Sequence, residues 1–212
     1  MQAELWKLHC ELETFSTSTL YHAEDLPFSI KAIPDVFTDF RRKTEKEAPI
    51  RNTFDKPTRI YSPEIPLLNL PTLSALGLEN VTIDSRAVLQ FKGGESEAIQ
   101  RLKHYFFETK AISRYKETRN GMIGADYSSK FSAWLALGCI SPRFIYQELK
   151  KYETQFGANE STYWLVFELL WRDYFRFMMK KHQSKLFQKS GIRNKELATE
   201  KTEWEVEVLK YI

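Results

Sequence analysis

Residues 163–182 read YWLVFELLWRDYFRFMMKKH, and apolar side chains recur in this stretch at the spacing of a helix. Residues 159–162, NEST, come directly before it and offer several side chains that can cap a first helical turn. The pattern predicts one long helix over about 163–182, mostly apolar, and therefore the centre of a helical core.

The sequence before this stretch contains further helical patterns. Helices are predicted over 95–108 (ESEAIQRLKHYFFE), over 111–119, over 131–138 (FSAWLALG), and from 141 to about 152, where Ser141-Pro142 is a good cap and first turn. No segment alternates apolar and polar residues convincingly with period two. Residues 91–190 are therefore predicted to form an all-α unit without a sheet.

The chain before residue 91 is less regular. Residues 49–90 hold five of the eight prolines and little periodicity, which predicts a long irregular linker between two structural units. Helices are predicted over 3–12 and 35–46, whereas the polar stretch 14–30 has no regular pattern. A last helix is predicted over the tail, 195–212.

Charge and aromatic content are unevenly distributed. Residues 91–190 hold 17 basic against 10 acidic side chains and 20 of the 30 aromatic residues, whereas residues 1–90 hold 10 basic against 13 acidic side chains. A basic, aromatic block is typical of a surface that binds polyanions with stackable rings. A large aromatic core beneath a mildly basic surface explains the same composition.

Several classes of function have little support in this sequence. Two cysteines, Cys10 and Cys139, cannot build a disulfide framework or a four-cysteine zinc site, and the four histidines lie at no metal-ligand spacing. We expect no metal site. A Gly-x-Ser-x-Gly elbow is absent, and the apolar runs are too short for a membrane span. No targeting segment is visible, so we expect a cytoplasmic protein.

The long predicted helix carries the first candidate site. Glu168, Trp171, Arg172 and Phe175 are three and four residues apart and therefore share one stripe, which Trp164 extends by a turn. An acid, a flat ring and a guanidinium on an apolar helix need partners if they are buried. The alternative is an Arg–Glu pair at the edge of a core that the tryptophans fill.

The second candidate is the loop DYSSKFS, residues 126–132. Its serines, its backbone N–H groups and Lys130 precede a predicted helix, an arrangement that can hold a phosphate. The loop is not a Walker motif, and an ordinary helix cap explains the same residues.

YKETRNGMIGADYSSKFSAWLALGCISPRFIYQELKKYE at 115–153 and STYWLVFELLWRDYFRF at 161–177 closely resemble the FAD-binding region of the photolyase/cryptochrome family. The DASH cryptochromes are the most similar group. STLYHAEDLPF, IPDVFTDFRR and FKGGESEA also resemble that group, so the similarity extends from about residue 4 to 190 in order.

The resemblance implies a role for each candidate residue. It places FAD against Tyr115, Ser128, Ser129, Lys130, Phe131, Ser132 and Arg172. The loop of residues 126–132, called the serine loop below, would lie at the diphosphate. It places Glu168 and Trp171 in a cavity for a flipped pyrimidine dimer, and Arg119 on the side that faces DNA. No catalytic side chain is implied within these residues, because the flavin carries the chemistry.

The implied fold is mainly α: a truncated helical FAD-binding domain of photolyase type. Residues 1–48 would be the remnant of an α/β antenna domain with its connecting helices, 49–90 the interdomain linker, and 91–212 the first half of the FAD-binding domain. The intact family fold would supply the remaining flavin contacts and a folate-type antenna chromophore.

The implied function is light-dependent repair of cyclobutane pyrimidine dimers, mainly in single-stranded DNA, by electron transfer from FAD. No protein partner is predicted. Two alternatives stay open: a non-catalytic blue-light sensor or regulator with the same flavin pocket, and a cofactor-free helical module that binds single strands through aromatic residues. Glu168 and Trp171 favour repair, because a sensor has no need of a pair that reads a dimer.

Overall fold

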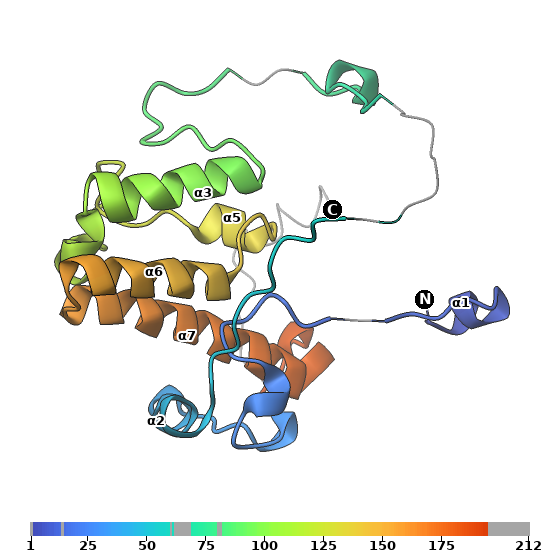
Figure 1. Cartoon of the computed structure of the whole chain (residues 1–212). Helices are drawn as coiled ribbons and strands as arrows, with labels where there is room; N and C mark the ends of the chain where they lie inside the picture. Colours follow the sequence, from blue (N-terminus) through green and yellow to red (C-terminus); the bar gives the residue numbers. More distant parts are fainter. Residues whose placement is uncertain (1, 14, 60, 62–68, 80–81, 195–212) are drawn as a thin grey trace, which may run out of the picture.

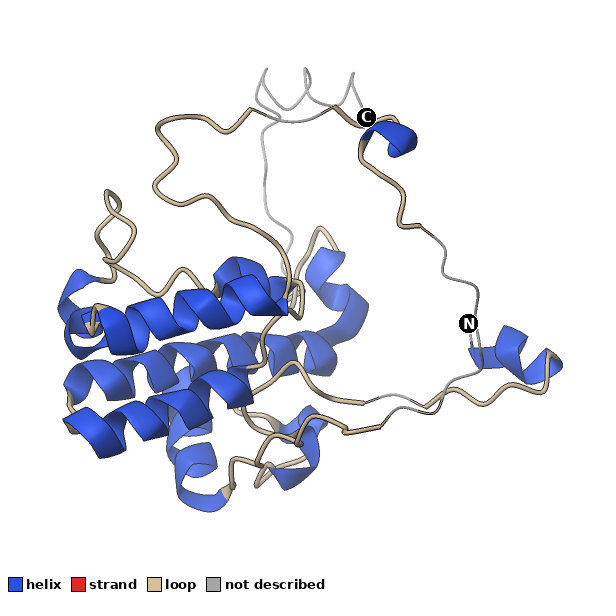
Figure 2. Cartoon of the chain, turned by 45° about the horizontal axis from the view of Figure 1, so that its top comes forward, coloured by secondary structure: helices blue, strands red, loops and turns tan. Residues whose placement is uncertain are grey.

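The longest helix is α7 (Glu160–His182), and it packs against α2 (Phe37–Glu47), α4 (Tyr115–Thr118) and α6 (Pro142–Phe156). Figure 1 shows it between α6 and α2 in this computed structural model, which describes residues 2–13, 15–59, 61, 69–79 and 82–194. The described residues contain helices and loops and no β-strand (Figure 2). The protein is therefore mainly α, as the periodicity predicts.

Local sequence explains where the two longest helices begin. The Asn159 side chain accepts from the backbone N–H of Thr162, and the Thr162 hydroxyl accepts in return from the N–H of Asn159, so a capping box starts α7. The Ser141 hydroxyl accepts from the N–H of Phe144, and Pro142 occupies the first turn of α6. Gly157, at a φ of 90°, ends α6.

The remaining predicted helices between 91 and 190 are present with changed boundaries. The predicted helix 95–108 is α3 (Glu95–Lys103) followed by one π-helical turn, η4 (His104–Glu108). The predicted helix 111–119 divides into a 3-10 turn, η5 (Ala111–Arg114), and α4. The apolar helix before Gly138 is α5 (Ser132–Ala136). No helix in the described part of the chain is long and apolar enough to cross a membrane.

The N-terminal prediction is partly wrong. Instead of a helix over 3–12, α1 spans Gln2–Lys7, and His9 has a left-handed φ of 53° that ends it. Trp6 and Leu8 are 79% and 70% exposed, so among the described residues packing does little to support a longer helix. α1 lies apart from the other helices in Figures 1 and 2.

Residues 49–90 are irregular, as predicted: within their described parts the only helical turn is η3 (Ser74–Leu76). The predicted tail helix, 195–212, lies outside the described residues. The division of the chain into three units at residues 48 and 90 stays a prediction.

One hydrophobic cluster includes Leu20, Ile33 and Phe40 from the first part of the chain together with core side chains of α3, α6 and α7. The segment 19–40 is thus packed on the helical body rather than separated from it.

Candidate functional site

An open cavity of about 520 Å³ lies between α7 and the segment that leads into α5. Most of the site residues that the sequence predicts gather here, although they come from parts of the chain up to 57 positions apart. Seven of the ten line the cavity: Tyr115, Ser129, Phe131, Ser132, Glu168, Trp171 and Arg172. Phe175 of the predicted stripe on α7 also lines this cavity, whereas Trp164, one turn earlier, does not.

Three predicted residues do not line this cavity. Ser128 and Lys130 alternate with Ser129 and Phe131, and only the latter two reach the cavity. Lys130 has a left-handed φ of 60°, which turns the chain at this point. Arg119 instead forms an ion pair with Glu168, at 2.9 Å between Nη1 and Oε1. The predicted residue of the DNA-facing side and the predicted base-reading acid are therefore direct partners.

The backbone of the serine loop offers unused donors. In the described part of the chain, the N–H groups of Ser128, Ser129, Lys130, Phe131 and Ser132 donate to no protein group. The loop is close to the start of α5, where the first N–H groups of a helix also lack intrahelical acceptors. This end of the cavity therefore provides hydrogen-bond donors for an anion.

Tyr115, at the start of α4, lines one side of the cavity. Burial raises the pKa of its hydroxyl to about 12, and the nearby Glu168 carboxylate acts in the same direction. The phenol is therefore neutral at physiological pH and retains its proton as a hydrogen-bond donor.

Arg172 connects three segments at the cavity wall. Its guanidinium donates to the carbonyl oxygen of Ser18 and, at 3.1 Å, to that of Leu135 at the end of α5. Burial lowers the pKa of this group, and the neighbouring charge of Arg176 adds to the effect. Arg172 is thus fixed in place by protein contacts while it borders the cavity.

Asp173 follows Arg172 on α7, and no role for it was predicted from the sequence. Its side chain is fully buried and accepts hydrogen bonds from the backbone N–H groups of Leu20 (3.0 Å) and Tyr21 (2.9 Å). Burial raises the pKa of the carboxyl to about 7, against the opposing effect of those two hydrogen bonds. A single aspartate on an apolar helix is the sequence signal, because a buried acid needs partners.

Trp171 has aromatic neighbours as well as a cavity side. Its ring stacks on Phe37 of α2, with centroids 3.5 Å apart and planes 13° apart, and lies nearly parallel to Phe175 at 5.5 Å. Phe167 and Tyr174 meet it edge-on. Trp171 therefore fills volume beside α2 and also lines the cavity, and its contact with a base stays a prediction.

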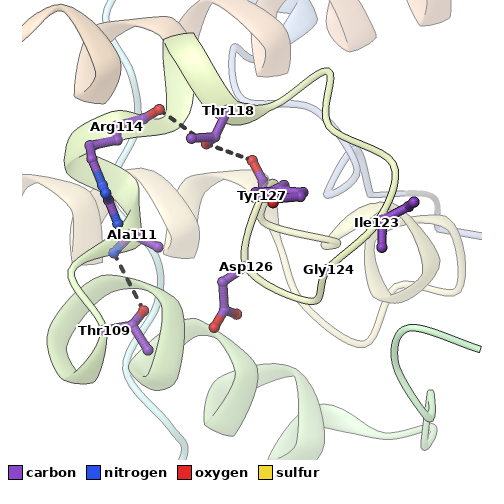
Figure 3. Close-up of a pocket in the computed structure, with 8 residues that line it drawn as sticks. All are labelled: Thr109, Ala111, Arg114, Thr118, Ile123, Gly124, Asp126 and Tyr127. Carbon is purple, nitrogen blue, oxygen red and sulfur yellow. Dashed lines mark hydrogen bonds between the residues drawn. The ribbon is translucent and has the colours of Figure 1, made fainter.

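A second hollow, of about 390 Å³, is lined by Asp126 and Tyr127 of the loop 126–132 but by none of the residues predicted to contact FAD or DNA (Figure 3). Thr118 of α4 links η5 to the loop there, with its hydroxyl 3.0 Å from the carbonyl oxygen of Arg114 and 2.7 Å from that of Tyr127. Asp126 turns from the loop toward the helix beneath it. This hollow belongs to the scaffold that holds the loop.

Known proteins are similar to this chain in sequence and in fold. No family model matches the chain. A protein called cryptochrome DASH from Gloeobacter violaceus is 50% identical over 208 residues, which is 97% of this chain and 41% of that protein. The cryptochrome DASH of Danio rerio is 51% identical over 187 residues, 87% of this chain and 36% of that protein. A crystal structure of a Synechocystis cryptochrome superposes with a TM-score of 0.89 and 48% identity, over 98% of this chain and 43% of that one.

The strand-free helical body matches the helical fold of the photolyase/cryptochrome family, and the chain belongs to that family. Within the family its relatives are the DASH cryptochromes. The chain spans about two fifths of the length of the curated relatives it matches.

Proposed function

We propose that the cavity between α5 and α7 binds FAD and that the chain contributes this site to a light-dependent DNA-repair protein of DASH type. One observation carries the proposal: the serine loop, Tyr115 and Arg172 border the same cavity as Glu168 and Trp171. The residues proposed to hold the cofactor and those proposed to meet the substrate border one space, and this supports the proposal.

The residues present fit a flavin dinucleotide. Unused N–H donors of the serine loop, with the Ser129 and Ser132 hydroxyls, provide partners for a diphosphate at one end of the cavity. Phe131 and Leu169 contribute apolar wall against which a flat ring can pack, and Tyr115 contributes a neutral hydroxyl. Bound FAD would supply the electron that splits a pyrimidine dimer under light.

The substrate side of the proposal rests on Glu168, Trp171 and Arg119. A damaged base must leave its stack to reach a buried cofactor, and an aromatic edge with a hydrogen-bonding acid suits such a base. Arg119 is 30% exposed at its side chain and pairs with Glu168, so it can hold that acid in position or meet a phosphate. Single strands are the proposed substrate, because their bases are extracted at lower cost.

The absorption spectrum of the purified 212-residue chain with added FAD tests the proposal. Retention of a yellow, protein-bound flavin after gel filtration supports it. A colourless chain that still binds single strands would replace it with the cofactor-free binding module.

Ser129→Asp should sharply reduce flavin content. Ser129 is buried at the cavity wall, and a carboxylate there would place negative charge beside the diphosphate. Bound flavin per chain, measured by absorbance after gel filtration, checks this. Ser113→Asp is the matched control, because Ser113 lies on η5 outside the cavity lining and should leave the flavin content unchanged.

A second candidate function is a blue-light sensor with the same cofactor. The stacking of Trp171 on Phe37 favours it, because one face of the proposed dimer platform is already covered. Irradiation of dimer-containing single strands with the FAD-loaded chain separates the two. Loss of dimers under blue light supports repair, and light-dependent flavin reduction with the dimers intact supports the sensor.

A further inference from the structure

Arg101 lies beneath the serine loop, and its guanidinium forms hydrogen bonds with four residues at 125–129. It projects from α3, is 7% exposed, and donates to the carbonyl oxygens of Ala125 (2.7 Å), Ser128 (3.1 Å) and Ser129 (3.0 Å). It also forms an ion pair with Asp126 at 2.8 Å. A single buried side chain therefore holds four groups of one short loop.

These contacts determine which way the loop's peptide groups point. In a planar trans peptide the carbonyl and the N–H of the following residue point in opposite directions. Because the carbonyls of Ser128 and Ser129 face Arg101, the N–H groups of Ser129 and Lys130 point away from it. Those N–H groups have no protein acceptor in the described residues, and Ser129 itself lines the cavity.

We propose that Arg101 is the positioning residue of the flavin's diphosphate site: it draws the carbonyl oxygens of Ser128 and Ser129 inward and so leaves the N–H donors of Ser129 and Lys130 for the phosphates. A carbonyl turned to the other side would repel a phosphate. This inference rests on the proposed function, since it names how the chain recognises the diphosphate half of FAD.

A guanidinium is required here because of its shape. Its planar fork serves several oxygens in one plane, whereas the ammonium of lysine is a single point charge on a flexible stem. Asp126 is itself held from two sides, by Arg101 and by His104 at 3.2 Å. Burial acts to raise the pKa of Asp126, but the hydrogen bonds from these two partners keep it below its ordinary value. The carboxylate therefore stays charged and fixes the orientation of the fork.

The test compares three flavins that differ in phosphate: FAD, FMN and riboflavin. Equilibrium binding to the 212-residue chain is measured by flavin fluorescence for the unmodified protein, Arg101→Lys and Arg101→Met. We expect Arg101→Lys to weaken FAD binding about tenfold, as the loss of one or two hydrogen bonds implies, and Arg101→Met to weaken it more. Riboflavin affinity should change less than about twofold, because riboflavin has no phosphate to reach the loop.

A stability control separates positioning from folding. Asn159→Ala removes the capping box of α7 and should cost about 1 kcal/mol without touching the loop, so it should weaken FAD and riboflavin equally or not at all. Equal losses of FAD and riboflavin in Arg101→Lys would make Arg101 a structural residue and overturn the inference. FAD binding unchanged in both Arg101 variants would also overturn it.

Two further outcomes concern the wild-type chain. If it binds riboflavin as tightly as FAD, the loop is not a diphosphate site. That result would overturn the role of Arg101 but not the proposal that the cavity binds a flavin. If it binds neither, the proposed function itself falls, and this result is distinct from any effect of Arg101.

Discussion

Trp171→Ala is expected to lower the free energy of unfolding by about 3 kcal/mol, because it removes a large ring from a packed aromatic cluster. The ring stacks on Phe37 at 3.5 Å and contacts Phe167 and Tyr174 edge-on. Chemical denaturation of both proteins measures the loss. Phe175→Ala is the matched control: Phe175 is on the same stripe but 59% exposed, so its truncation should cost about 1 kcal/mol or less.

The same variant tests the substrate side of the cavity. If Trp171 also contacts a flipped base, Trp171→Ala should weaken the binding of dimer-containing single strands by ~1–3 kcal/mol, the loss typical of one stacking contact. Undamaged strands should lose less, since phosphate contacts dominate their binding. Equal weakening toward damaged and undamaged strands, together with the stability loss, would show Trp171 to be a core residue alone.

A double-mutant cycle isolates the stacking between Phe37 and Trp171. Combining Phe37→Ala with Trp171→Ala should cost less than the two single changes together by about 1 kcal/mol, because the pair is lost only once. Strict additivity would show that the two rings are packed side by side without a specific interaction.

Helix positions were predictable from the sequence because their signals are local. Asn159 with Thr162, Ser141-Pro142 and the apolar periodicity of 163–182 act within a few residues of one another, and each is found as expected. The break between α3 and η4 was not predictable, since the apolar pattern continues unchanged through His104. The length of α1 was also missed, because periodicity alone does not show whether an apolar side has a packing partner.

The site was predictable where one helix face defines it. Glu168, Trp171 and Arg172 point into the same cavity because spacings of three and four place them together on α7. Arg101 and Asp173 were missed because each acts through backbone groups of a distant segment. Backbone carbonyls and N–H groups have no sequence signature, so the polar residues 18–30 gave no sign that this segment docks on α7.

Asp173 fastens that docked segment and makes its attachment depend on pH. The folded-state pKa of about 7 lies well above the ordinary aspartate value of 3.8. Between these two values the folded protein therefore holds a proton that the unfolded chain has lost. Stability from this group is complete below about pH 4 and is lost as pH rises toward 7, because in this range unfolding releases the proton and a higher pH favours that release.

Asp173→Asn should therefore destabilise the protein more at pH 5 than at pH 8. Asparagine keeps the volume but offers one acceptor oxygen to two backbone donors, so the N–H of Leu20 or Tyr21 is left buried without a partner, at a cost of about 1–3 kcal/mol. The variant also lacks the titration, which adds a difference on the order of 2–4 kcal/mol between the two pH values. Urea unfolding of both proteins at pH 5 and pH 8 measures these differences. An equal cost at both pH values, or a larger one at pH 8, would show that Asp173 is already charged throughout this range and that its two hydrogen bonds outweigh its burial.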